Sequence, residues 1–230
     1  MLYVRGWDRP DYSVEACKFA VADTRSAADT ALRSVAVNRN GSQFTASGPS
    51  DRDSGWRMVF FVHAPNDASV KLDSGNAPVE ATNVTGTLTI RATNGPLALE
   101  RCAGTVDAET VNGPISMTGG SGAVRLLASN GPISLHLGDA AWSGSQLQVR
   151  TNNGPLGVTL PGGFRSGVRV ETSGHAPINC AADACQAART EGNRFFPRSM
   201  QLNGATDIVR LSTQNGPVSI RNTGKRTPVL

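Results

Sequence analysis

The chain has 230 residues, of which 17% are charged and 5% are aromatic, and its formal net charge is +4. Its arginines are spread along the chain without a dense basic run, so the sequence predicts no nucleic-acid-binding surface. No run of 18 apolar residues occurs, which argues against a membrane-spanning helix. The 25 glycines and 13 prolines are typical of many short strands joined by tight turns.

Residues 1–67 lie outside the repeated part of the sequence. They predict a β-rich capping region with strands over 2–5, 12–19, 35–37, 43–46 and 57–63. A short helix is predicted over 24–34, with Asp23 or Thr24 as its N-cap. We expect this region to cover the first edge of the repeats, because a bare sheet edge invites aggregation.

A short phrase, Asn-Gly-Pro followed by an apolar residue, returns through the rest of the chain. Its clear copies begin at Asn94, Asn112, Asn130, Asn153 and Asn215, and the first three are 18 residues apart. Each unit divides into two halves that read glycine, any residue, apolar, any residue, apolar. This alternation predicts one strand with a single buried face in each half. The Asn-Gly pair predicts a turn, because both residues tolerate a positive φ.

Such units stack most simply as a right-handed parallel β-solenoid over residues 68–230, in which each coil rises by about 4.8 Å. We count about seven coils: 68–85, 86–103, 104–121, 122–143, 144–165, 166–206 and 207–224. Alternating apolar residues form the predicted core, and the asparagines are predicted to hydrogen-bond from coil to coil. The alternative is an antiparallel β-sandwich, although hairpins do not require an 18-residue repeat.

The regular units are interrupted by insertions. Trp142 lies in a bulge over 138–142, a second bulge covers 161–164, and the main insertion covers 181–206. Insertions in a solenoid map to loops, often on the binding face. Candidate binding residues are therefore Trp142 and five residues of the main insertion, namely Arg189, Arg194, Phe195, Phe196 and Arg198. The alternative interpretation is a flap whose two phenylalanines seal the far end of the core.

One outward-facing column on the Asn-Gly-Pro strands carries only small residues: Ala98, Ser116, Ser134, Gly157, Asn179 and Ser219. It predicts a flat face against which something lies closely. The N-terminal region, a second copy of the chain or an extended polymer are the three possible occupants. Ser116 and Ser134 join the candidate binding residues for this reason, and the second copy would make the protein a homo-oligomer.

Residue patterns that carry catalysis are sparse. Asp107 and Glu109 share the outer face of one strand, but no matching carboxylate follows on the flanking coils, as the carboxylate pair of a glycosidase would require. The sequence has no Gly-x-Ser-x-Gly elbow at a strand-to-helix junction and no glycine-rich phosphate loop before a helix. We therefore predict no catalytic residue and no cofactor.

The four cysteines are Cys17, Cys102, Cys180 and Cys185. Cys180 and Cys185 are close enough in sequence to form a disulfide, which would suit an oxidising compartment. The alternative for Cys180 is a small buried hydrophobic residue, because it falls in a core column. Neither a second cysteine pair nor a nearby histidine completes a zinc site, and a calcium-like start at 51–55 lacks the later ligands, so no metal site is predicted.

Several phrases together resemble the bacterial putative adhesin family of repeated β-strand proteins, a largely uncharacterised group. They are Gly6-Trp7-Asp8, the short Ala-rich helix, the strand ending in His63-Ala64-Pro65, and the repeated Asn-Gly-Pro corners. The resemblance covers almost the whole chain. It implies an exported or cell-envelope setting and no known catalytic residues. The chain departs from the family in its long insertion and in showing no leader or anchor, so we interpret it as a mature or trimmed form.

We therefore expect a non-enzymatic, exported β-solenoid that acts as an adhesin-like binding module for a cell-surface polymer or an envelope protein. The first alternative is a polysaccharide lyase or hydrolase on a β-helix scaffold, which fold analogy alone supports. The second alternative is an envelope scaffold or sensor subunit that contacts another protein through the insertion at 181–206.

Overall fold

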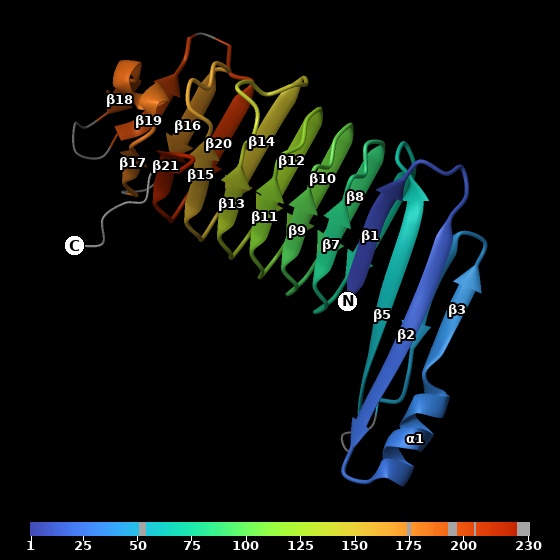
Figure 1. Ribbon diagram of the computed structural model, residues 1–230. Coiled ribbons are helices and arrows are strands. Elements are labelled where there is room, and N and C mark those ends of the chain that lie inside the picture. The colour runs from blue at the N-terminus through green and yellow to red at the C-terminus, as the bar shows by residue number, and fades with distance from the viewer. Residues whose placement is uncertain (51–53, 174–175, 193–196, 205, 225–230) are drawn as a thin grey trace.

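The computed structural model describes residues 1–50, 54–173, 176–192, 197–204 and 206–224 (Figure 1). These residues form strands, one α-helix and one short 3₁₀-helix, so the all-β prediction is confirmed. From β6 to β17 successive strands alternate between two large sheets (Figure 1). The two sheets face each other across one hydrophobic core. No helix in this part of the chain is long and apolar enough to cross a membrane.

The first sheet has ten strands. In spatial order they are β17 (Ile178–Cys180), β21 (Val218–Asn222), β15 (Leu156–Leu160), β13 (Ile133–His136), β11 (Ile115–Thr118), β9 (Leu97–Glu100), β7 (Val79–Thr82), β1 (Leu2–Trp7), β5 (Ser54–Pro65) and β2 (Ser13–Ala22). Neighbours are parallel except at the β5–β2 edge, where the pairing is antiparallel.

The second sheet has nine strands. In spatial order they are β18 (Arg189–Gly192), β19 (Pro197–Leu202), β16 (Val168–Thr172), β20 (Val209–Thr213), β14 (Gln146–Thr151), β12 (Ala123–Ala128), β10 (Thr105–Thr110), β8 (Thr87–Ala92) and β6 (Ser69–Ser74). The strands from β16 to β6 are parallel, whereas β18 and β19 pair antiparallel at one edge.

The N-terminal region adds a small satellite core. Helix α1 (Arg25–Ser34) begins where predicted, and the Thr24 hydroxyl accepts a hydrogen bond of 3.2 Å from the Ala27 N–H. The hairpin of β3 (Ala36–Asn40) and β4 (Gln43–Ser47) follows it. Buried Val35, Met58 and Phe60 pack with the half-buried side chains of this hairpin and of β5.

The predicted core columns are buried between the two large sheets. On the Asn-Gly-Pro strands the first apolar positions are aligned in register and at most 1% exposed, as Leu97, Ile115, Ile133, Leu156 and Val218 show. The columns weaken at the ends of the stack, where Val70 and Ile178 are only half-buried. Periodic burial of this kind is what the alternating pattern requires.

The corner asparagines form the predicted hydrogen-bonded ladder. Each side-chain amide donates to the carbonyl oxygen of its neighbour at 2.6 to 2.9 Å, in the order Asn215, Asn153, Asn130, Asn112, Asn94, Asn76. Beneath the ladder, the buried hydroxyls of Thr110, Thr151 and Thr213 donate to corner carbonyls of adjacent repeat units. The corners are therefore tied together both outside and inside.

The glycine of each Asn-Gly-Pro corner serves a different purpose from the one predicted. The predicted turns are present, but the reason given for them does not apply, because Gly95, Gly113, Gly131, Gly154 and Gly216 do not have a positive φ. They are needed because the corners stack closely. A Cβ on Gly113 would stand 2.3 Å from the Gly95 carbonyl oxygen, and the other four corner glycines meet a carbonyl oxygen at 2.0 to 2.3 Å.

The strands do not stack in the order of the sequence. The final pair, β20 and β21, lies between β14–β15 and β16–β17, so the last unit in the sequence is not the last one in space. At the other end, β1 lies between β5 and β7, so the N-terminal region extends the ten-stranded sheet edge-on. Each inserted strand pairs in parallel with both neighbours.

The insertion at 181–206 folds back onto the end of the core. It contains the 3₁₀-helix η1 (Asp183–Ala187) and the β18–β19 hairpin, in which β19 pairs with β16. Met200 and Leu202 of β19 are buried, and so is Ala182. Cys180 and Cys185 form the predicted disulfide. Of the other cysteines, Cys17 is exposed and Cys102 is buried, and this burial raises the pKa of the Cys102 thiol.

Candidate functional site

The structure separates the binding residues that the sequence predicted. Ser116 and Ser134 are exposed on the outer face of the ten-stranded sheet, and Arg189 and Arg198 are exposed on the β18–β19 hairpin. Arg194, Phe195 and Phe196 lie outside the described residues, so the sealing role proposed for the two phenylalanines remains a prediction. The described sealing residues are Met200 and Leu202.

The prediction that Trp142 lies on a binding surface is wrong. Its side chain is 6% exposed and belongs to the main core. The indole N–H donates a hydrogen bond of 3.1 Å to the Gly122 carbonyl oxygen, while its backbone N–H donates to the Ser166 hydroxyl. A tryptophan is buried readily when its N–H finds a partner, so the four extra residues around it fill the core instead of leaving it.

The small outward column does form one row in register across the sheet. Beyond Ala98 this row continues to Glu80, Tyr3 and Phe61, because β7, β1 and β5 are neighbours. The rings of Tyr3 and Phe61 stack with their centroids 5.0 Å apart. The N-terminal region therefore borders this face with an aromatic pair and does not cover it.

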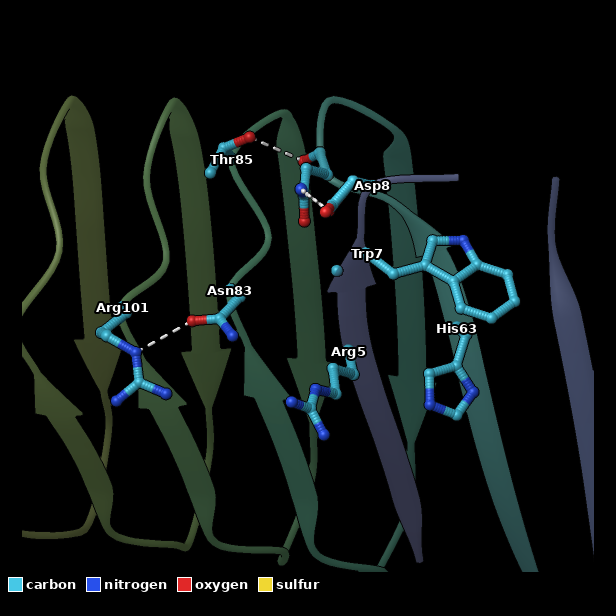
Figure 2. Close-up of a pocket in the computed structure, with 9 residues that line it drawn as sticks. Arg5, Trp7, Asp8, His63, Asn83, Thr85 and Arg101 are labelled. Atoms are coloured by element: carbon cyan, nitrogen blue, oxygen red, sulfur yellow. Dashed lines mark hydrogen bonds between the residues drawn. The ribbon is translucent and has the colours of Figure 1, made fainter. Parts of the chain in front are cut away.

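A cavity of about 520 Å³ opens beside the end of β1, and we call it the β1 trough. It is lined by Arg5, Gly6, Trp7, Asp8, His63, Asn66, Asn83, Thr85 and Arg101. Figure 2 shows that Arg5 lies between two pairs, Asn83 with Arg101 on one side and Trp7 with His63 on the other. These residues come from β1, the end of β5, and the corners that follow β5, β7 and β9.

Strand β1 sets the geometry of the trough. Its alternation buries Val4 and Gly6 and turns Arg5 and Trp7 outward. Gly6 allows β1 to reach the corner after β7, because a Cβ there would stand 2.0 Å from the Asn83 carbonyl oxygen and 2.5 Å from the Asn66 side-chain oxygen. Glycine is the one residue that permits such a close approach of two backbones.

The corner residues Asn83 and Arg101 have left-handed backbone conformations, with φ of 57° and 48°. For arginine this region is sparsely populated, and strain of this kind costs on the order of 1 kcal/mol or more. The Arg101 Nε donates a hydrogen bond of 2.9 Å to the Asn83 side-chain oxygen, and its Nη1 pairs with Glu100. The two strained corners, after β7 and after β9, therefore hold the Asn83 amide and the Arg101 guanidinium at fixed positions on one wall of the trough.

The opposite wall is also fixed in place. The Trp7 ring stacks on His63 with centroids 5.0 Å apart, and the Arg9 guanidinium lies over the same indole at 4.9 Å. The Trp7 indole N–H donates a hydrogen bond of 2.9 Å to the Asp11 carbonyl oxygen. Trp7 is thus held by its contacts and offers a rigid, partly apolar wall.

Electrostatically the trough favours a ligand that accepts hydrogen bonds. The Arg5 guanidinium is exposed and has no hydrogen-bond or ion-pair partner among the described residues, while Asp8 supplies the carboxylate among the lining side chains. Within the described chain no group of three or more His, Cys, Asp or Glu is placed to hold a metal ion. The arrangement can bind a carboxylate, a sulfate or a hydroxyl-rich ring, but it has no nucleophile paired with a base.

Sequence reasoning missed this site. The signals available were Gly6-Trp7-Asp8 and the strand ending in His63-Ala64-Pro65, which were used for a family resemblance and not for a site. Arg5 and Arg101 carry no motif of their own. They become neighbours only because β1 is inserted between β5 and β7, a pairing that the repeat does not encode.

No protein-family model matches the chain, and no curated protein matches it. A solved structure from Clostridium sporogenes ATCC 15579, named "putative cell adhesion protein", is similar over 96% of this chain and 87% of that one. Its sequence identity with this chain is 9% and the TM-score is 0.37. A likeness of that size carries no argument about what this chain binds.

Proposed function

We propose that this protein is a non-enzymatic, exported adhesin-like module of the bacterial cell envelope, which binds a saccharide group of a cell-surface polymer in the β1 trough. In this proposal the two large sheets form a right-handed β-solenoid that serves as a rigid support. The observation that carries the proposal is the guanidinium of Arg5, which has no partner among the described residues and lines a cavity of about 520 Å³.

The chemistry of the lining supports a saccharide. Sugar rings combine many hydrogen-bonding hydroxyls with apolar ring faces, and the trough offers the guanidinium and amide groups of Arg5, Arg101, Asn66 and Asn83 beside Trp7. A guanidinium also binds a carboxylate or sulfate in bidentate fashion, which favours an acidic sugar over a neutral one. The disulfide at Cys180–Cys185 supports the exported setting, because such bonds persist in oxidising compartments.

A polymer is supported by the face onto which the trough opens. The row of small side chains runs in register from β9 to β17 without a bulky residue, so an extended chain that enters the trough can continue along this face. Many weak contacts repeated at each strand then add to the affinity of the trough. Hydrolysis is disfavoured because a glycosidase needs two carboxylates roughly 5–9 Å apart, and Asp8 is the carboxylate that lines the described trough.

The test is retention of the protein on a panel of bacterial cell-wall and matrix polysaccharides, with release of new sugar ends measured in the same tubes. Arg5→Ala should weaken retention about 10- to 100-fold, because a hydrogen bond to a charged group contributes roughly 1.5–3 kcal/mol. Arg33→Ala on the exposed surface of α1 removes the same charge far from the trough and serves as the control.

Three results contradict the proposal. Equal retention of Arg5→Ala and Arg33→Ala would remove the trough from binding. Release of sugar ends would favour the lyase or hydrolase alternative. Failure of the unaltered protein to bind any polysaccharide in the panel would favour an envelope protein as partner. Arg5 is exposed and pairs with none of the residues that the structure describes, so the variant should fold normally, and its unfolding midpoint checks that.

A further inference from the structure

The outer face of the nine-stranded sheet carries two very different charge arrangements. On β6, β8, β10 and β12, three basic and three acidic side chains face outward, and all of them are paired: Lys71 with Asp73, Arg91 with Asp107 and Glu109, and Arg125 with Asp107. The Arg91–Asp107 contact is the shortest at 2.7 Å, and the hydrogen bond that Arg91 donates to the Asp107 carboxylate raises the pKa of Arg91. In this half of the face each of these six charged side chains therefore has a partner of opposite charge.

In the half formed by β14, β20 and β16 the positive charges are not balanced in this way. Arg150, Arg210 and Arg169 face outward there against Glu171, which pairs with Arg169 at 2.7 Å. Arg210 has no hydrogen-bond or ion-pair partner among the described residues, and Arg150 donates only to the Asn152 side chain at 3.4 Å. Three guanidinium groups therefore face outward on these strands beside Glu171, with Asp207 near the start of β20 as a further acid.

The insertion of β20 creates this cluster. Arg210 stands directly opposite Arg169 in the parallel register, at the strand spacing of about 4.8 Å. Like charges in directly opposite positions destabilise a sheet. If β16 paired directly with β14, as the order of the sequence suggests, Arg169 would lie next to Gln148 instead.

Two adjoining cavities lie over the cluster. One of about 440 Å³ is lined by Arg125, Arg150, Arg169 and Arg210 among others, with Glu171 and Asp207 as its acids. The other, of about 560 Å³, shares Arg150, Glu171 and Ser212 with the first and extends to Arg198 on β19. Together they form a hollow that runs across several strands and is lined by five arginines and by three carboxylates, those of Glu171, Asp207 and Glu191.

We infer that this arginine cluster is a second binding site, for the anionic groups of an acidic polysaccharide. A carboxylate or sulfate between Arg150 and Arg210 accepts charge-assisted hydrogen bonds from both and relieves the repulsion between Arg210 and Arg169. Arg210 lines the first cavity and Arg198 lines the adjoining one, so a chain with repeated charges can contact both cavities at once. The site lies on the sheet opposite to the one that carries the β1 trough and does not depend on it.

The test measures binding of the full chain to polygalacturonate, dextran sulfate, neutral dextran and duplex DNA over a range of salt concentrations. The double variant Arg150→Gln/Arg210→Gln should bind one of the two acidic polysaccharides at least tenfold more weakly than the unaltered protein. Its affinity should also depend less steeply on salt, because fewer ions are released on binding. Neutral dextran should not bind at this site.

The matched control is Arg33→Gln/Arg39→Gln, which removes the same charge from the N-terminal region and should change affinity less than twofold. Polygalacturonate and dextran sulfate distinguish a carboxylate from a sulfate as the bound group. The loss caused by Arg150→Gln/Arg210→Gln should be equally large in a chain that also carries Arg5→Ala, which separates failure of this site from failure of the β1 trough.

The inference is overturned if both double variants lose affinity equally, if neither acidic polysaccharide binds, or if DNA binds as tightly as the better of the two. Stability gives an independent check. In buffer without polyanions, Arg210→Gln should unfold at an equal or higher denaturant concentration than the unaltered protein, because it removes a like-charge contact. A lower midpoint contradicts the repulsion on which the inference rests.

Discussion

The middle of the molecule and its two ends are built by different rules. From β8 to β13 every unit pairs with the units next to it in the sequence, and one set of contacts repeats at each step: an asparagine bond, a corner glycine and two buried apolar residues. At each end a strand from elsewhere in the sequence is inserted, namely β1 between β5 and β7, and β20 with β21 beside β14 and β15. Both candidate sites lie at these insertions.

The difference shows how a repetitive scaffold acquires individual sites. Stacked copies of one unit place equivalent residues next to each other, so the surface of the middle is flat and its polar side chains pair with one another. An inserted strand brings a side chain beside neighbours that the repeat did not select for it. This is how Arg5 and Arg101 come to line one cavity, and how Arg210 comes to lie opposite Arg169.

The largest expected effect is in the middle. Gly113→Ala should lower the free energy of unfolding by about 3 kcal/mol, the upper part of the range for overpacking, because its Cβ meets the Gly95 carbonyl oxygen at 2.3 Å and both groups are backbone. Gly138→Ala is the control, since nothing lies within 4 Å of its Cβ, and it should change stability by less than about 1 kcal/mol. Urea unfolding of both variants decides the matter, and equal midpoints would show that the corners can separate freely.

An intermediate effect is expected at the far end. Replacing Cys180 and Cys185 together by serine removes a bridge across five positions and should cost about 2 kcal/mol in the chain-entropy model. Hydrogen exchange should rise in the insertion around η1 and β18 while the middle strands keep their protection. Cys17→Ser, at an exposed site, serves as the control and should change nothing. Loss of protection throughout the molecule would mean that the ends and the middle are not separate units.

The smallest effect separates two positions of one ladder. Asn112→Ala removes two side-chain hydrogen bonds, to Asn94 and from Asn130, and should cost about 1–2 kcal/mol. Asn215 makes one such bond among the described residues, so Asn215→Ala should cost about half as much. Thermal and urea unfolding of the two variants provide the comparison. A larger loss at Asn215 than at Asn112 would mean that the inserted end, and not the middle, limits stability.

Much of the scaffold could be predicted from the sequence because the repeat states it many times over. The alternation placed Leu97, Ile115 and Ile133 in one buried column. The asparagine ladder could be predicted from the equal spacing of the asparagines in the repeat. The reason for the corner glycines was misread, because a positive φ and a close approach of two backbones both require glycine and look the same in a sequence. Ala77 gives a hint in retrospect: it occupies the glycine position at the corner after β6, the edge strand, where no earlier corner is stacked.

The order of the strands could not be predicted in the same way. Val168 and Val170 of β16 fit the core column as well as Val209 and Leu211 of β20 do, so apolar alternation cannot decide which strand lies beside β14. Both sites depend on that order, and for this reason they were missed. The prediction for Trp142 was wrong for a related reason. Extra residues in a repeat can form either an exposed loop or a larger core, and the sequence pattern is the same in both cases.

The position of β20 and β21 also imposes a schedule on the growing chain. During synthesis β16 and β17 emerge first, yet the parallel neighbours against which they finally lie are made some forty residues later. Until then the free edges of β14 and β15 present a pairing surface that β16 and β17 match equally well in apolar pattern. A nascent chain that closes this edge too early must open it again before the last strands can enter. Correct assembly of this end is therefore complete only after β21, which ends at Asn222, has left the ribosome.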